Sequence, residues 1–295
     1  MELELNSRAT PFNLDHTLSC GQVFRWEKVG NDWWGIVDEN LVRVSQREDK
    51  LYCKTFPDEK EEAFVKEYFR LDDDLPYIIS LINKDKTIGE ALNRLHGLRI
   101  VRQDPWECLI SYICATFSNI SRIRAMIQNL SRKFGREISY DGLTFYTFPK
   151  REALAKATLG ELLDCRLGFR AKYIREASKM VKDCELDFES LKRLPYREAK
   201  GQLLTLPGVG PKVADCILLF SLDKLEAFPV DVWIKRIISK HYSQHFRDIE
   251  LLKKTGLTIR NYEQINTFGR EYFGEYAGYA QEYLFHYYRL HTPSD

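Results

Sequence analysis

A lysine and an aspartate, 19 positions apart, offer the clearest chemistry in this chain of 295 residues. Lys212 follows the run Leu-Pro-Gly-Val-Gly-Pro at 206–211, and Asp231 follows Phe-Pro-Val at 228–230. An uncharged amine can attack carbon, and a nearby carboxylate can stabilise positive charge and relay protons. The pair predicts covalent catalysis, with Lys212 as nucleophile. Two plainer interpretations stay open, because a lysine at a helix start is often only exposed and an aspartate there is often an N-cap.

The run before Lys212 predicts a hairpin between two helices at 204–213. Gly208 and Gly210 flank Val209, and glycine lets backbone N–H groups approach a phosphate because no Cβ blocks them. Lys212 then falls in the first turn of a helix expected over 212–222, where the positive end of the helix dipole disfavours an ammonium. The segment therefore predicts a DNA phosphate contact beside an amine nucleophile.

The helices and strands that must position these residues fall into two predicted regions, which meet near residue 98. From about 23 to 56, short β-favouring runs alternate with turn signals, which predicts an antiparallel meander, and 61–98 has helical spacing. After residue 98 we expect helices to the end, including one that starts at the Asp-Pro-Trp-Glu signal of 104–107. The fold class is thus predicted as α+β, with an N-terminal domain over 1–98 and a helical domain over 99–295. Further helices are expected at 120–135, 150–164, 170–182, 196–204, 231–239 and 276–289.

Composition narrows the class of protein. No apolar run is long enough to span a bilayer and the first residues lack a signal-peptide pattern, so we expect an intracellular protein with no membrane contact. Seven cysteines without a C-x-x-C pair favour reduced thiols. The net charge of +1 argues against a general polyanion binder, but residues 122–136 form a local basic stripe, which could equally be a solvated helix face.

The hairpin and aspartate together resemble the helix-hairpin-helix (HhH-GPD) DNA glycosylases, in the branch that removes 8-oxoguanine. The resemblance covers most of the chain in the family order. It rests on the segments 20–26 (CGQVFRW), 103–109 (QDPWECL), 167–173 (LGFRAKY), 206–216 (LPGVGPKVADC), 229–232 (PVDV) and 276–281 (YAGYAQ). It implies a helical core with a β-rich N-terminal domain, and an enzyme of base excision repair with both glycosylase and AP lyase activity.

The resemblance also implies roles for residues outside the hairpin. Lys212 would form a Schiff base and Asp231 would be the essential acid. Phe285 and Cys216 would sandwich a flipped base, Gln281 would bind its Watson–Crick edge, and the carbonyl of Gly21 would accept the N7 hydrogen of oxidised guanine. Without the family, core packing is the simpler interpretation of Cys216 and Phe285.

Further resemblances concern the DNA around the lesion. Phe169 matches a wedge that fills the gap in the duplex, and Arg122 and Arg170 match residues that hold the estranged base. Asn119 and the hairpin residues Gly208, Val209 and Gly210 are also expected to contact the DNA. Phe117 stands where the eukaryotic pattern has an asparagine, so we expect weak discrimination of the base opposite the lesion. Trp233 replaces a histidine of that pattern, with an effect that the sequence does not define.

The expected partner is double-stranded DNA that contains oxidised guanine, bound by a monomer located with the genomic DNA. No cofactor is expected. An iron–sulfur cluster is excluded because no cysteine follows Cys216, while the resemblance allows a monovalent cation at the carbonyls of Leu204, Leu206 and Val209. Two alternatives stay open: a glycosylase for alkylated or other damaged bases on the same fold, and a non-catalytic DNA-binding module.

Overall fold

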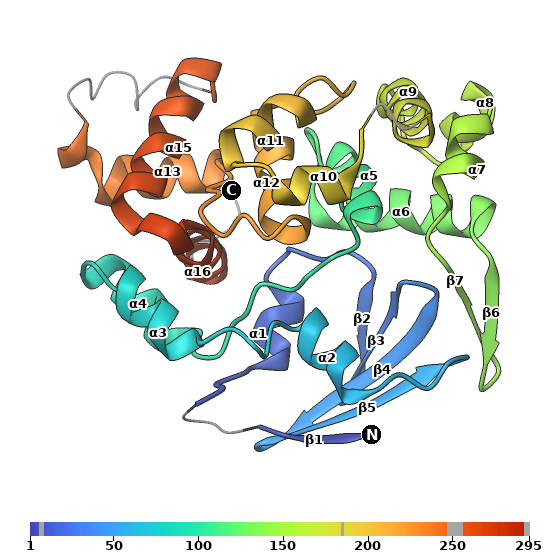
Figure 1. Cartoon of the computed structure of the whole chain (residues 1–295), viewed down its shortest axis with the longest axis horizontal. Helices are drawn as coiled ribbons and strands as arrows, with labels where there is room; N and C mark the ends of the chain where they lie inside the picture. Colours follow the sequence, from blue (N-terminus) through green and yellow to red (C-terminus); the bar gives the residue numbers. More distant parts are fainter. Residues whose placement is uncertain (6–8, 184–185, 247–255, 292–295) are drawn as a thin grey trace.

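The computed structural model describes residues 1–5, 9–183, 186–246 and 256–291. It has the predicted α+β class, with an antiparallel sheet below a body of helices (Figure 1). The sheet has five strands in the order β1-β5-β4-β3-β2. They are β1 (Glu2–Glu4), β2 (Trp26–Val29), β3 (Asp32–Val37), β4 (Asn40–Arg47) and β5 (Lys50–Phe56). The predicted meander over about 23–56 is confirmed as β2 to β5, although β2 begins only at Trp26.

Successive side chains of a strand point to opposite faces of the sheet, and here both faces carry apolar side chains. One face carries Trp33 and Val44, which are register partners, and packs in one cluster with Val65 of helix α2 (Glu62–Tyr68). The opposite face carries Trp34, whose ring stacks on Phe145 at 5.9 Å between centroids. The sheet is therefore covered on both sides.

The cover on the second face is a β-hairpin that the sequence analysis assigned to helix. Strands β6 (Glu137–Tyr140) and β7 (Leu143–Tyr146) pair through a turn in which Asp141 and Gly142 have φ of 50° and 73°. An Asp-Gly pair with positive φ at both positions is the turn that best fits a two-residue hairpin. The expectation of helices from residue 98 to the end is thus wrong here, and the Asp-Gly signal was present in the sequence.

Most other helices lie where the pattern predicted them. Asp104 caps the first central helix by accepting the Glu107 N–H at 2.7 Å, as expected. The predicted helix over 150–164 is instead two helices, because Ala157 is extended and Thr158 starts the second with a capping box. The structure adds two helices that were not predicted, α10 (Phe188–Arg193) and α15 (Ile259–Phe273), the second of which begins after the Thr258 cap.

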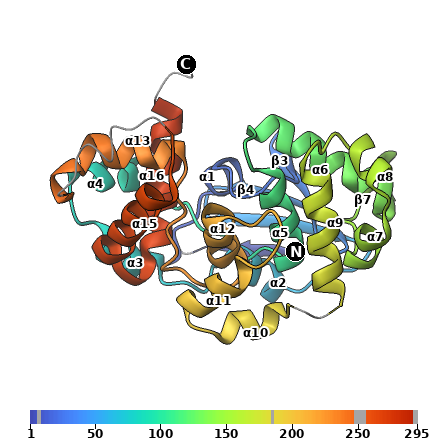
Figure 2. The ribbon, with the colours of Figure 1, turned by 90° about the horizontal axis from the view of Figure 1, so that it is seen from above.

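The helices form two lobes around a buried centre (Figure 2). The centre holds α5 (Pro105–Cys114) and α12 (Pro211–Ser221), with α11 (Tyr196–Leu203) and α10 (Phe188–Arg193) beside them. One lobe contains α6 (Ile120–Phe134), α7 (Arg151–Lys156), α8 (Leu159–Asp164) and α9 (Arg170–Lys182). The other contains α3 (Leu75–Ile82), α4 (Lys86–Arg94), α13 (Val232–His241), α15 (Ile259–Phe273) and α16 (Ala277–His291). Helix α1 (Leu14–Ser19) lies above the sheet, and short 3-10 turns cover Ser243–His245 and Gly274–Tyr276.

Helices α5 and α12 are buried along most of their length because both are apolar nearly all round. They are packed together, and Tyr112 stacks on Phe220 at 5.6 Å. Helices α3 and α4, which precede residue 98, pack against the C-terminal helix α16. Because elements on both sides of residue 98 share one core, the domain division there stays a prediction.

Candidate active site

The hairpin between α11 and α12 has the backbone that the glycines predicted. Gly208 has a φ of 83°, and a Cβ there would lie 2.7 Å from the Cβ of Tyr173. Gly210 is the N-cap of α12, in an extended conformation, and a Cβ there would meet open space. No described side chain caps the α12 N-terminus, so its first N–H groups are available to an anion. Gly208 is needed for the turn, whereas the space around Gly210 is open.

Lys212 and Asp231 both stand at helix N-termini. Lys212 is partly buried in the first turn of α12. Asp231 is the N-cap of α13, and its Oδ1 accepts the Ile234 N–H at 2.8 Å. The capping role that the sequence left open is therefore present, and it fixes the carboxylate in place.

The charges of Lys212 and Asp231 both act on the Cys216 thiol. Cys216 lies one helical turn after Lys212 and is buried. Burial raises the pKa of its thiol, and the charge of Lys212 opposes this rise while that of Asp231 adds to it. The amine and the carboxylate thus both lie within electrostatic reach of one buried thiol, which can pack against a ligand but does not ionise near neutral pH.

The loop at Gly21 meets helix α16. Gly21 has a φ of 107°, and a Cβ built there would lie 3.5 Å from the Phe285 ring and 2.6 Å from Nη1 of Arg289. Gln281, one turn before Phe285, is buried, and its Oε1 has no hydrogen-bond partner among the described residues. A buried acceptor without a hydrogen bond lowers the stability of the fold. This position therefore fits a ligand that supplies a hydrogen-bond donor.

Comparison with known proteins assigns the family. Residues 4–109 match the model of the 8-oxoguanine DNA glycosylase N-terminal domain, and residues 110–256 match that of the HhH-GPD superfamily of base excision DNA repair proteins. The chain is 34% identical over 288 residues to the N-glycosylase/DNA lyase OGG1 of Arabidopsis thaliana, covering 94% of this chain and 77% of that protein. The chain belongs to the 8-oxoguanine DNA glycosylases of the HhH-GPD superfamily.

Two further relatives agree with this assignment. The N-glycosylase/DNA lyase of Saccharomyces cerevisiae is 32% identical over 322 residues, covering 92% of this chain and 82% of the yeast protein. The 8-oxoguanine glycosylase/lyase of Clostridium acetobutylicum, solved with double-stranded DNA containing cytosine opposite 8-oxoguanine, is 35% identical with a TM-score of 0.85. That similarity covers 95% of this chain and 92% of the Clostridium chain.

In this glycosylase, the predicted wedge lies at the start of α9. The ring of Phe169 is 54% exposed and contacts that of Tyr173 edge-on at 6.2 Å between centroids. The Arg170 guanidinium lies 4.5 Å from the centre of the Phe169 ring. Its donors bind the main-chain carbonyls of Thr116, Phe117 and Leu167. Arg170 thus supports the wedge and the loop at 116–117, and its contact with an estranged base stays a prediction.

The loop at 117–119 is exposed beside this wedge. Phe117 has a φ of 49° and is 91% exposed, so nothing in the folded chain explains an aromatic ring there. The Asn119 side chain accepts the Arg122 N–H at 3.0 Å as the N-cap of α6. The Arg122 side chain is exposed. The cap occupies the Asn119 carbonyl oxygen and leaves its amide group for other contacts.

The sequence analysis missed a buried carboxylate next to the site. Asp215 is fully buried and accepts hydrogen bonds from Tyr196 at 2.5 Å, from Asn266 at 3.0 Å and from Tyr262, and it pairs with Lys200 at 2.7 Å. This network joins α11, α12 and α15 behind the hairpin. A charged residue within the apolar run 213–220 was the signal that could have identified it.

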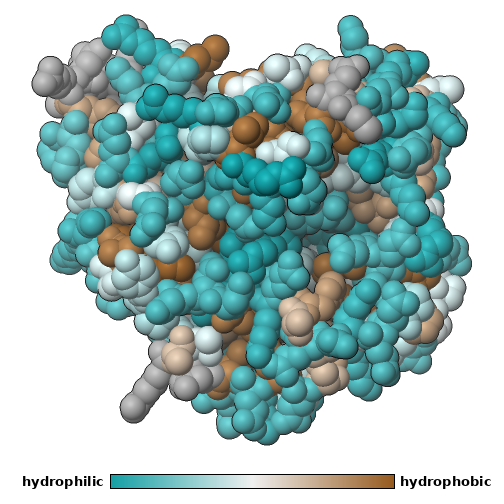
Figure 3. All heavy atoms as spheres, in the orientation of Figure 1, coloured by the Kyte–Doolittle hydropathy of each residue, from teal (hydrophilic) through white to brown (hydrophobic). Residues whose placement is uncertain are grey.

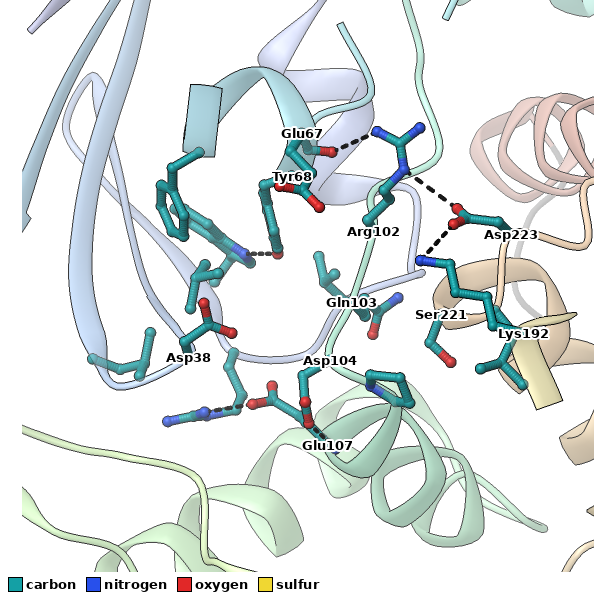
Figure 4. A pocket seen from close by; sticks show the side chains of 18 of the residues that line it. Asp38, Glu67, Tyr68, Arg102, Gln103, Asp104, Glu107, Lys192, Ser221 and Asp223 are labelled. Carbon is teal, nitrogen blue, oxygen red and sulfur yellow. Dashed lines mark hydrogen bonds and ion pairs between the residues drawn. The ribbon is translucent and has the colours of Figure 1, made fainter. Parts of the chain in front are cut away.

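A cavity of about 270 Å³ lies away from the hairpin, between the sheet and the start of α5 (Figure 4). Asp38, Asp104 and Glu107 line one side of it, and Arg102 and Lys192 pair with Asp223 on the other. None of the predicted catalytic or base-binding residues lines this cavity. Its charged side chains are mostly paired with one another, which is typical of a polar junction between elements.

The described residues show neither a membrane span nor a metal site. No helix among them is long and apolar enough to cross a bilayer, and they contain no group of three or more histidine, cysteine or acidic side chains placed to hold a metal ion. The face shown in Figure 3 is mostly hydrophilic, with scattered hydrophobic groups rather than one broad patch.

Proposed function

We propose that this protein removes 8-oxoguanine from duplex DNA and then cleaves the strand, with Lys212 as nucleophile and Asp231 as the essential acid. The observation that supports the proposal is that Lys212 lies in the first turn of one helix and Asp231 caps another, with the buried Cys216 one turn after Lys212. The Gly21 loop and Phe285, which would hold the base, adjoin each other. The enzyme acts on genomic DNA as part of base excision repair.

The chemistry follows from an amine placed at the sugar. The Lys212 Nζ bonds to C1′ as the bond from C1′ to N9 breaks, and the electron pair and a proton leave with the base. The sugar becomes positively charged on this path, and the fixed Asp231 carboxylate stabilises that charge. Ring opening gives an imine between Nζ and C1′. Loss of a C2′ proton then expels the 3′ phosphate, which breaks the strand.

Recognition requires the base to leave the duplex, since C1′ and the base edges are not accessible within the stack. Phe285 and Cys216 supply the stacking surfaces, and the unpaired Oε1 of Gln281 suits the donors of the guanine Watson–Crick edge. The carbonyl of Gly21 accepts the N7 hydrogen, which 8-oxoguanine has and guanine lacks.

DNA is held through its backbone at the hairpin. The uncapped amides at the α12 N-terminus bind a phosphate, and Phe169 fills the space that the flipped base leaves. A monovalent cation at the carbonyls of Leu204, Leu206 and Val209 is part of this proposal. The Leu206 carbonyl already accepts the Val209 N–H at 3.1 Å, which leaves it one lone pair for a cation.

The deciding experiment is borohydride trapping on a duplex with one 8-oxoguanine. The wild-type protein should give a covalent protein–DNA adduct, and Lys212→Gln should bind the duplex without forming it. Lys54→Gln, on an exposed position of β5, is the matched control and should trap like the wild type. Base release without any adduct would instead indicate hydrolysis by water, as in the alkylbase glycosylases. Binding without base release by the wild type would indicate a non-catalytic module.

A further inference from the structure

Helix α16 carries several buried polar atoms that have no hydrogen-bond partner among the described residues. Among the described residues, four atoms on this helix lie buried with no hydrogen-bond partner: Gln281 Oε1, Glu282 Oε1, His286 Nε2 and Arg289 Nη1. Buried polar groups are almost always paired, so such a cluster points to a ligand. Gln281 already has a proposed partner, the Watson–Crick edge. Arg289 has none, although its guanidinium faces the same loop.

The position of the Arg289 guanidinium is fixed on one side. Its Nη2 donates to the Ser19 carbonyl at 2.7 Å and lies 3.3 Å from Nδ1 of His286. Burial and the Arg289 charge lower the pKa of His286 to about 3, so its ring stays neutral and can accept. The guanidinium carbon lies 5.0 Å from the centre of the Phe285 ring. Nη1 therefore remains as the free donor, held next to the stacking surface and to Gly21.

We infer that Arg289 is a specificity-determining residue whose Nη1 donates a hydrogen bond to the C8 oxygen of the flipped base, beside the Gly21 carbonyl that accepts its N7 hydrogen. This inference rests on the proposed function. The two protein groups form a donor and an acceptor side by side. They are complementary to the edge of 8-oxoguanine, in which N7–H and C8=O are adjacent.

Guanine offers the opposite pattern. It has an acceptor at N7 and only a C–H at C8, so it would leave the Gly21 carbonyl facing a lone pair and Arg289 without its C8 partner. Leaving buried polar groups unpaired is a stronger basis for rejection than a change in shape. A second contact to the oxidised edge thus adds to the discrimination that the carbonyl supplies.

The test uses duplexes that bind without reacting. A 2′-fluoro sugar disfavours positive charge at C1′, so duplexes with 2′-fluoro-8-oxoguanosine report base recognition alone. Arg289→Met keeps the side-chain length and removes the donors. We expect it to lose at least tenfold in affinity for this duplex and less than twofold for a duplex with a tetrahydrofuran abasic site. Arg47→Met, which removes an exposed arginine from β4, is the control and should change neither affinity.

A second comparison separates direct contact from support of the loop. An 8-thioguanine base keeps N7–H but has sulfur, a weak acceptor, at C8. The wild type should prefer 8-oxoguanine over 8-thioguanine, and Arg289→Met should lose that preference. If Arg289→Met weakens binding of both modified bases by the same factor, the residue only supports the Gly21 loop and the inference is wrong. Failure of the proposed function gives a different result, because the wild type would then release no 8-oxoguanine.

Discussion

Tyr173 packs against Gly208, so closely that a Cβ on the glycine would lie 2.7 Å from the tyrosine Cβ. Tyr173 also contacts the Phe169 ring edge-on. This contact joins the wedge on α9 to the hairpin before α12. The predicted wedge and the predicted phosphate-binding backbone are therefore held at a fixed relative position.

The two hairpin glycines should respond differently to alanine. Gly208→Ala places a Cβ at positive φ and against Tyr173, and should lower the free energy of unfolding by about 2 kcal/mol. Gly210→Ala adds a Cβ in open space and should leave stability within about 0.5 kcal/mol, while weakening DNA binding because the methyl group blocks the amides. Urea unfolding and duplex titration measure the two effects. Equal stability of both variants would contradict the described turn.

The wedge should matter for DNA and not for folding. Because Phe169 is half exposed, Phe169→Ala should cost little stability. It should weaken binding of a lesion duplex about tenfold, since stacking between an aromatic side chain and a base contributes roughly 1–3 kcal/mol. Phe169→Tyr keeps the stacking face and should bind like the wild type. A Phe169→Ala protein with unchanged affinity would remove the residue from the interface.

The base opposite the lesion should be weakly discriminated. The Phe117 ring cannot hydrogen-bond a cytosine edge, and the Asn119 side chain caps α6. Excision rates opposite cytosine and opposite adenine should therefore differ by much less than a hundredfold. Phe117→Asn introduces a donor and an acceptor, and should raise the preference for cytosine. A wild-type preference of a hundredfold would refute this expectation.

The buried network behind the hairpin should stabilise the fold. Lys200→Met removes the charge that pairs with Asp215, and leaving that carboxylate without its cation should cost about 3 kcal/mol. Lys54→Met at an exposed position should cost less than about 0.5 kcal/mol. Denaturant unfolding at neutral pH gives both values. If Lys200→Met loses no more stability than the control, the neutral hydrogen-bond donors around Asp215 are enough to stabilise its carboxylate.

Two buried groups of α16 should make stability depend on pH in opposite directions. Burial raises the pKa of Glu282 to about 7. The contribution of this group to the free energy of unfolding is therefore full below about pH 4.5 and is lost as pH rises through 7, which lowers that free energy by about 3 kcal/mol. The pKa of His286 is lowered to about 3, so its contribution is full above about 6.5 and falls with acid, by about 2 kcal/mol at pH 5. The other ionisable groups that act on this pair are Cys20, Asp231, His16, His291 and Arg289.

Each single variant should expose the effect of the remaining group. Glu282→Gln should lose stability as pH falls from 6.5 to 5, and His286→Asn should lose stability as pH rises from 5 to 7. His96→Asn, at an exposed position, serves as the control and should follow the wild type. Unfolding midpoints at several pH values measure these slopes. Parallel curves for all the variants would show that neither group has a shifted pKa in the folded protein.

Local patterns determined much of this protein from the sequence alone. The cap at Asp104, the turn at Gly208 and the strand alternation of the meander each depend on neighbouring residues, so their types and spacing sufficed. The roles of Lys212 as nucleophile and of Asp231 as acid stay predictions from the residue types. The prediction was wrong at residues 137–146, where a hairpin stands instead of a helix. The Asp-Gly turn signal was present there, but the segment lies between two predicted helices.

Tertiary structure alone decided which distant residues meet. Gly21 and Arg289 are far apart in the chain, and Asp215 finds its partners on two other helices. Side-chain periodicity defines which face of an element is buried, but not which other element covers it, because packing energy depends on shape and polarity across the whole core. The unpaired donor of Arg289 and the raised pKa of Glu282 arise from such long-range burial, and no spacing in the sequence could have shown them.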